Sequence, residues 1–268
     1  MDQTILFYVL AALSSFLVGA SKGGLPMVGV LSVPILALAI SPVAAAALLL
    51  PIYIVSDVVG LWAYRREFDM RNLVILVPAM VLGVGVGWAT AHVTPEWLVK
   101  LLVAVIGLWY CIGVLVKRKN VPAKPADVPR GVFWGTIAGF TSFVSHTGGP
   151  PYQMYTLPQK MPKMVFAGTS TIAFAIINAV KLVPYWALGQ FNTSNVETAL
   201  MLSPIAVAGA LIGYKATKVL PEKLFFRLIE VALAAVSVKR CLRPARWPIS
   251  SAESPVRTIS ASSTDRRS

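Results

Sequence analysis

Charged residues and cysteines are both scarce in this chain. Only 13% of its 268 residues are charged, whereas 56% are hydrophobic, and the mean hydropathy is +0.71. A soluble globular domain carries roughly 25% charged residues, so this composition excludes an ordinary soluble protein. Two cysteines, Cys111 and Cys241, are too few for a disulfide framework or a cysteine metal site. The P-loop pattern is also absent from the sequence, which argues against direct drive by nucleotide hydrolysis within this chain.

Long apolar stretches fill most of the chain instead. A helix needs about 20 residues to cross the hydrocarbon core of a bilayer, and most of these stretches approach that length. We therefore predict an all-α fold, a polytopic bundle of membrane helices. The first stretch is expected to be a retained helix rather than a signal peptide, because Asp2 precedes it in place of a basic cluster. The stretches are residues 5–21, 25–40, 43–63, 72–91, 97–116, 131–145, 164–187, 198–214 and 223–238.

Basic residues outnumber acidic ones by 24 to 11, which gives a formal net charge of +13. Because they lie in short segments between and beyond the apolar stretches, membrane topology explains them better than a nucleic-acid partner does. The basic segments 64–71 and 117–130 are predicted to be cytoplasmic, and 188–197, which has no Lys or Arg, external. A single helix at 223–238 would separate two further basic segments, so the side of the C-terminus stays open.

The same landmarks recur in the same order in two halves of the chain. Ser21–Pro26 is answered by Ser145–Pro151, and Asp57 by Asn178. Later landmarks keep a constant offset of 126 residues: Pro78 and Pro204, Gly87 and Gly213, Pro95 and Pro221. The predicted organisation is a first membrane repeat at 1–116, a basic cytoplasmic linker at 117–130, a second membrane repeat at 131–242 and a disordered basic tail at 243–268.

The charge pattern predicts that the halves are inverted relative to one another. The loop 64–71 is basic while its counterpart 188–195 is not, and the loop 92–96 is poor in basic residues while 215–222 is rich in them. Inverted repeats are common in transporters. They require an odd number of crossings in each half, and five would fit if the short segments after the Gly-Gly pairs count as full or partial crossings.

Each half begins with a helix that runs into a Gly-Gly pair and a proline, which an uninterrupted helix tolerates poorly. Such a break is stable in lipid only where protein or a wet cavity satisfies the freed backbone groups. The segment 150–158 is too short to span and predicts a half-helix, whose free N–H groups attract anions. Paired half-helices point to a transport site near mid-membrane. The predicted substrate-binding residues are Ser21, Lys22, Gly23, Gly24, Ser145, His146, Thr147, Gly148 and Gly149.

Ionisable residues inside apolar stretches are the other candidates. A lysine at the bilayer centre costs about 2.5–3.5 kcal/mol on insertion scales, so we expect Lys22 to bind the anion; the alternative is that it snorkels to the interface. His146 could donate a hydrogen bond to the ligand, carry a coupled proton or simply pack. Asp57, Asn178 and Lys181 are possible coupling groups, and helix packing is the alternative for each.

These residues also carry a family resemblance. The chain is similar to the sulfite exporter TauE/SafE permease family from about Phe16 to Leu242, and the basic tail beyond is a departure from it. The first glycine cluster is also sparser than in many relatives. The resemblance implies a secondary transporter in the cytoplasmic membrane of a bacterium, associated in some members with export of sulfite or organosulfonates. It rests on the breaks Gly19–Pro26 and Ser145–Pro151, followed by the small-residue stretches Ser41–Ala47 and Val165–Ser170.

Two other functions are compatible with the sequence. Gly19–Gly23 fits the G-x-S-x-G elbow of serine hydrolases, with His146 or His92 as a partner, but the elbow needs a preceding strand and none is predicted. An anion channel would share the broken helices. We expect a transporter rather than an enzyme, with a small anion and the lipid bilayer as partners, protons as a possible coupling ion and no cofactor or metal. The oligomeric state stays open.

Overall fold

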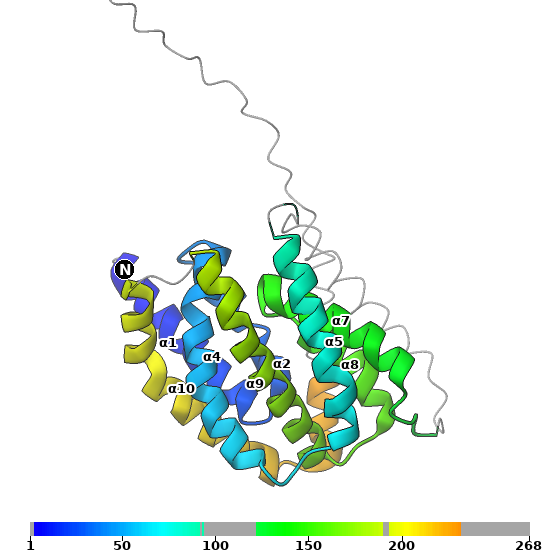
Figure 1. Cartoon of the computed structure of the whole chain (residues 1–268). Coiled ribbons are helices and arrows are strands. Elements are labelled where there is room, and N and C mark those ends of the chain that lie inside the picture. The colour runs from blue at the N-terminus through cyan, green and yellow to red at the C-terminus, as the bar shows by residue number, and fades with distance from the viewer. Residues whose placement is uncertain (1–2, 92, 94–121, 190–192, 232–268) are drawn as a thin grey trace, which may run out of the picture.

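The computed structural model describes residues 3–91, 93, 122–189 and 193–231 (Figure 1). These residues are all-helical, as predicted, and contain no strand. The predicted stretch 97–116 and the predicted tail 243–268 lie outside them. The helices are α1 (Gln3–Lys22), α2 (Pro26–Gly29), α3 (Ser32–Leu36), α4 (Pro42–Tyr64), α5 (Met70–Ala89), α7 (Val128–Ser145), α8 (Gly149–Thr156), the 3-10 helix η1 (Leu157–Gln159), α9 (Lys163–Ala187) and α10 (Thr193–Val219), and residues 222–231 are helical as well.

Five of the described helices are long and apolar enough to cross a membrane. The predicted stretch 25–40 is different, because it forms the two short helices α2 and α3 instead of one span. Pro26 starts the first of them, and Pro34 lies in the first turn of the second, where a proline has no N–H to continue the hydrogen bonds of α2. The half-helix predicted at 150–158 is confirmed by α8 and η1. The spanning segments are Ile5–Lys22, Ala44–Tyr64, Met70–Ala89, Lys163–Ala187 and Val196–Val219.

Acceptor side chains begin three of the long helices. Ser41 Oγ accepts from the Ala44 N–H at 3.2 Å at the start of α4. Asp69 Oδ1 accepts from the Asn72 N–H at 2.7 Å at the start of α5. Asp127 Oδ1 accepts from the Arg130 N–H at 2.9 Å at the start of α7. Each satisfies a backbone donor that has no partner within its own helix.

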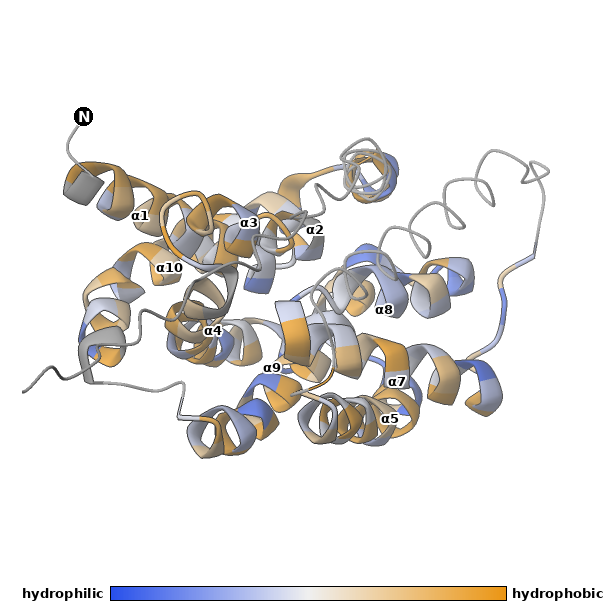
Figure 2. Cartoon of the chain, turned by 90° about the horizontal axis from the view of Figure 1, so that it is seen from above, coloured by the Kyte–Doolittle hydropathy of each residue, from blue (hydrophilic) through white to orange (hydrophobic). Residues whose placement is uncertain are grey.

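Two pairs of helices pack closely, with α4 and α9 between them. α1 lies along α10, α5 lies along α7, and α4 contacts α9 (Figure 2). Figure 1 shows that α4 and α9 run in opposite directions, as do α5 and α10. Each half therefore contributes a long first helix, short helices after a break, and two further long helices. Inversion of the halves across a bilayer stays a prediction.

Glycine allows the close approach in both helix pairs. A Cβ on Gly19 would overlap the Ala206 carbonyl of α10, and one on Gly83 would overlap the Thr136 carbonyl of α7. Small residues four apart bring helix backbones together in this way in membranes. The four motifs are Gly19–Gly23 at the end of α1, Gly209–Gly213 in α10, Gly83–Gly87 in α5 and Gly135–Gly139 in α7. The motifs of α5 and α10 also lie at the 126-residue offset of the sequence repeat.

One end of the bundle gathers the basic residues. Lys163 Nζ, at the start of α9, donates to the carbonyl of Lys218 at 2.9 Å and to that of Leu220, at the end of α10. The Asp69 N–H donates to Thr169 Oγ1 at 2.9 Å, which ties the α4–α5 loop to the same end. Apart from Lys22 and Lys181, the described Lys and Arg residues all lie in segments at this end: Arg65, Arg66, Arg71, Lys124, Arg130, Lys160, Lys163, Lys215, Lys218, Lys223 and Arg227.

Candidate functional site

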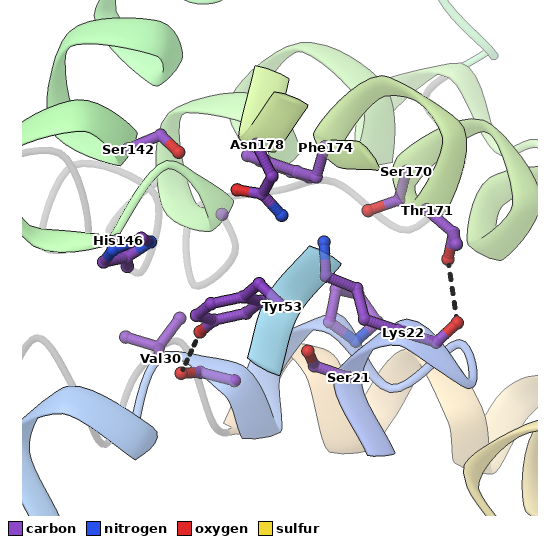
Figure 3. A pocket seen from close by; sticks show the side chains of 13 residues that line it. Ser21, Lys22, Val30, Tyr53, Ser142, His146, Ser170, Thr171, Phe174 and Asn178 are labelled. Carbon is purple, nitrogen blue, oxygen red and sulfur yellow. Dashed lines mark hydrogen bonds between the residues drawn. The ribbon is translucent and has the colours of Figure 1, made fainter. Parts of the chain in front are cut away.

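A small cavity lies inside the bundle, where the two breaks meet (Figure 3). Its volume is about 50 Å³. Four of the predicted substrate-binding residues line it: Ser21, Lys22, His146 and Gly149. Of the predicted coupling residues, Asn178 lines it. The other lining residues are Pro26, Gly29, Val30, Tyr53, Ser142, Ser170, Thr171 and Phe174.

The end of α1 places Lys22 at this cavity. Gly24 has φ +106°, a conformation that glycine adopts readily, and its N–H donates to the Ser21 carbonyl at 3.3 Å. The Leu25 N–H donates to the Ala20 carbonyl at 3.3 Å, which completes a Schellman motif. Lys22 therefore lies in the last turn of α1 and is buried. The predicted alternative, that Lys22 snorkels to the interface, does not fit a side chain that is 6% exposed.

Lys22 forms an ion pair inside the bundle. Its Nζ lies 2.7 Å from Oδ1 of Asp57, which comes from α4. Asn178 Nδ2, from α9, donates to Oδ2 of the same carboxylate at 2.7 Å. Both oxygens of Asp57 are thus engaged, one by each half of the chain. Asp57 and Asn178, which the repeat pairs by position in sequence, are in direct contact.

Lys181 is also fully buried, but its partners are neutral acceptors. Its Nζ lies 3.3 Å from both the carbonyl and Oγ of Ser142, and 3.0 Å from Nδ1 of His146. Within the described part of the chain, no carboxylate lies within 4 Å of this ammonium. A lysine ammonium has three donors, and these three acceptors match them. The predicted coupling residues therefore fall into two clusters, one around Asp57 and one around Lys181.

The hydrogen bonds of His146 define its neutral tautomer. With Lys181 as an ammonium, which can only donate, Nδ1 accepts from it and carries no proton. The proton then sits on Nε2, which donates to the Ala46 carbonyl of α4 at 3.2 Å. His146 has φ 51°, the left-handed conformation that ends α7. The histidine thus joins the second break to α4 and α9.

Tyr53 connects the two clusters. Its ring stacks on His146 with the centroids 5.0 Å apart and the planes 12° apart. Lys22 Nζ lies 5.2 Å from the centroid of the same ring and 5.8 Å from that of Phe174. Ring faces attract cations, so both aromatic residues favour a charged lysine here. The Tyr53 hydroxyl lies 3.0 Å from Ser32 Oγ, which fixes the ring.

The remaining predicted residues support the breaks without lining the cavity. The Gly23 carbonyl accepts from the hydroxyls of Tyr64 at 2.8 Å and Thr217 at 3.3 Å. Gly24 packs against the same two side chains. The hydroxyls of Ser145 and Thr147 lie 2.6 Å apart, and Gly148 packs against the Ala138 carbonyl of α7. These residues determine the path of the backbone on which Lys22 and His146 are carried.

The half-helix α8 offers fewer N–H groups than the sequence analysis assumes. Its first three residues are Gly149, Pro150 and Pro151, and a proline nitrogen carries no hydrogen. Gly149 alone among them has an N–H. α2 is only four residues long and also begins with a proline. The lysine side chains, rather than helix N-termini, are therefore the main positive charges near the cavity.

Sequence reasoning missed several lining residues that share a helix face with predicted ones. Tyr53 precedes Asp57 by four residues in α4, Phe174 precedes Asn178 by four in α9, and Ser142 in the last turn of α7 precedes His146, the residue that caps this helix, by four. Residues four apart project from the same side of a helix. Extending each predicted residue by one turn would have identified all three.

Comparison with known families agrees with this architecture. The family model of the sulfite exporter TauE/SafE matches residues 11–240, which is most of the chain. The chain belongs to the sulfite exporter TauE/SafE family. The resemblance predicted from the two breaks is thereby confirmed. The comparisons with curated proteins and with solved structures gave no match.

Membership of the TauE/SafE family makes this chain a multi-pass membrane protein of a sulfite-exporter type of transporter family. The G-x-S-x-G stretch of this TauE/SafE chain forms the end of α1 and the residue after it, and it packs through Gly19 and Gly23 on α10. Ser21 Oγ donates to the Val18 carbonyl at 2.7 Å, as serines inside helices commonly do. The helix-packing motif accounts for both glycines without a nucleophile elbow.

Proposed function

We propose that this protein is a secondary transporter of small anions that exports sulfite, an organosulfonate or a related sulfur oxyanion. The observation that carries the proposal is Lys22, a buried cation at a cavity lined by both halves of the chain. A buried ammonium that faces a cavity inside a membrane protein is a functional group by default, because placing it there is costly. Its Nζ is the proposed anchor for one oxygen of the substrate.

Polar groups around Lys22 suit an oxygen-rich head group. Ser170 places a hydroxyl at the cavity (Figure 3), whereas the hydroxyls of Ser21 and Thr171 donate to the carbonyls of Val18 and Lys22. The Asn178 amide has two N–H donors, of which Asp57 needs only one. Sulfite and sulfonates present three oxygens around one sulfur. The Lys22 ammonium with the neutral donors of Ser170 and Asn178 would hold such a group, and a volume of about 50 Å³ favours a small one.

The transporter is proposed to lie in the cytoplasmic membrane of a bacterium, with the basic end of the bundle at the cytoplasm. Its coupling ion is proposed to be the proton, with Asp57, Asn178 and Lys181 as the groups that respond to substrate. The two breaks, one in each half, give the bundle two places where backbone can move relative to a fixed site.

Flux in proteoliposomes tests the proposal. The full-length protein should carry radiolabelled sulfite or a small alkylsulfonate with saturable kinetics, and external unlabelled substrate should accelerate efflux. Lys22→Ala should lower the flux at least tenfold. The double variant Lys22→Met/Asp57→Asn leaves no unpaired carboxylate and should be equally inactive, which separates loss of the site from misfolding. Lys215→Ala, an exposed lysine of α10, is the matched control and should retain the flux.

Other results would favour the alternatives. Flux that does not saturate and shows no acceleration by external substrate would indicate a channel. Normal flux in both Lys22 variants would remove the cavity from the transport path. Hydrolysis of an ester by wild type, lost in Ser21→Ala, would indicate an enzyme.

A further inference from the structure

Asp57 occupies the position on Lys22 that a substrate anion would take. The carboxylate and the ammonium are 2.7 Å apart, and the side chains are 5% and 6% exposed. An oxyanion that binds Lys22 Nζ at the same distance would lie next to the negative charge of the Asp57 carboxylate. Like charges this close cannot both be ionised without a large penalty in a medium of low dielectric constant.

The surroundings of Asp57 leave few other ways to compensate the charge. Lys22 on α1 and Lys181 on α9 are the cations that act on it, and Asn178 donates to it. Tyr53 lies one turn earlier on α4, and neutral His146 at the end of α7 stacks on that tyrosine. α3 has no titratable side chain, and α10 has Glu197, Tyr214, Lys215 and Lys218 near its ends, at positions remote from the middle of the bundle.

We propose that Asp57 is the resident counter-ion of Lys22 and that it takes up a proton when the anion binds, so that proton and anion occupy the site together. The inference rests on the proposed function, since it assumes that Lys22 binds the substrate. In the empty site the carboxylate neutralises the ammonium. In the loaded site one proton from solvent resides on Asp57, and the substrate oxygen replaces the carboxylate on Lys22.

Linkage gives the direction of the pH effect. A proton on Asp57 frees Lys22, so anion affinity is highest at low pH and falls as Asp57 ionises. By reciprocity, anion binding must draw a proton onto Asp57. Over the range in which the empty site is ionised, affinity should weaken about tenfold for each unit of rising pH, because one proton is bound per anion.

A small alkylsulfonate is the appropriate probe, because it stays a monoanion throughout the range and contributes no titration of its own. Binding to the purified full-length protein in detergent should be measured from pH 5.5 to 8.5. Proton uptake should be followed in weakly buffered solution with an indicator dye. The affinity of wild type for the sulfonate should fall about tenfold for each unit of rising pH. Each bound sulfonate should be accompanied by the uptake of at most one proton.

Asp57→Asn should bind the sulfonate with an affinity that does not change with pH, and without proton uptake. The matched control is Asp127→Asn, which removes a carboxylate that is also paired with a cation, Arg130, but at the exposed start of α7. This control should show the same change of affinity with pH and the same proton uptake as wild type.

Wild-type binding with a flat pH profile and no proton uptake would overturn the role of Asp57 and leave the proposed function standing. This outcome needs no variant, so it holds even if Asp57→Asn does not fold. Proton uptake that persists in Asp57→Asn would also overturn it, and would move the proton to His146 or Lys181. No binding of sulfonate or sulfite by wild type at any pH would overturn both proposals.

Discussion

Two lysines are buried at the centre of this protein, and their partners differ. Lys22 faces a carboxylate, whereas Lys181 has only a carbonyl, a hydroxyl and an imidazole nitrogen around its Nζ. Removing one member of a buried ion pair leaves the other charge uncompensated, while replacing an unpaired buried charge by an apolar group relieves its desolvation. The same substitution should therefore have opposite effects at the two positions.

We predict that Lys22→Met lowers the free energy of unfolding by about 3–5 kcal/mol, since it leaves Asp57 without its cation. Lys181→Met should keep or raise the stability, since no carboxylate of the described residues lies within 4 Å of this lysine. Both are measured by unfolding in mixed micelles. Equal losses in the two variants would show that Lys181 depends on a charge partner. A stabilised Lys181→Met that also loses transport would mark Lys181 as functional.

Single residues were predictable from the sequence where their chemistry is unusual for lipid. Lys22, Asp57, His146 and Lys181 stand out as ionisable residues within apolar stretches. Their pairing could not be predicted, because it depends on which helices lie side by side. Lys22 contacts Asp57 of α4 and not His146, which the repeat places at the related position. Tyr53 was missed because an aromatic residue in an apolar helix is unremarkable until the fold brings a cation to its face.

At the scale of the elements, glycine determines which helices lie together. Both close helix pairs use glycines four residues apart, and a side chain at Gly83 would overlap the backbone of α7. Gly85 belongs to the same helix, but nothing lies within 4 Å of a Cβ placed there. The two positions form a matched pair within one turn of α5.

Gly83→Ala should therefore lower the free energy of unfolding by about 1–3 kcal/mol, since α5 and α7 must move apart. Gly85→Ala should cause no loss, because alanine favours the helix and meets open space. Unfolding in mixed micelles measures both changes. Equal stability of the two variants would contradict the close approach of the helices.

The sequence located the breaks in the helices better than it located the short helices after them. Gly-Gly pairs followed by proline correctly marked the ends of α1 and α7 and the half-helix α8. The stretch 25–40 is long and apolar enough to suggest one span, and Pro26 and Pro34 do not distinguish it, because spanning helices such as α4 and α5 contain proline as well. Composition cannot separate a spanning helix from short helices packed inside the bundle, because both are buried in apolar surroundings.

For the whole molecule, the orientation in the membrane follows from the asymmetry of charge between the ends. The α4–α5 loop, the start of α9 and the end of α10 lie together and are basic. The described residues 38–42, 89–91 and 187–189 contain no Lys or Arg. This proximity resolves part of the ambiguity in the charge pattern, because 215–223 joins 64–71 at one end of the bundle.

We predict that this basic end is cytoplasmic. In a background with Cys111 and Cys241 replaced by serine, Thr90→Cys should react with an impermeant maleimide added outside intact cells. Arg66→Cys and Lys215→Cys should react only after the membrane is opened, because positive segments are retained on the cytoplasmic side. Arg66 and Lys215 are exposed and Thr90 is partly exposed, so all three positions are accessible to the reagent once the membrane is open. Labelling of Arg66→Cys and Lys215→Cys from outside would reverse the orientation. Labelling of only one of them would contradict the helix arrangement itself, since the two halves place these residues at the same end.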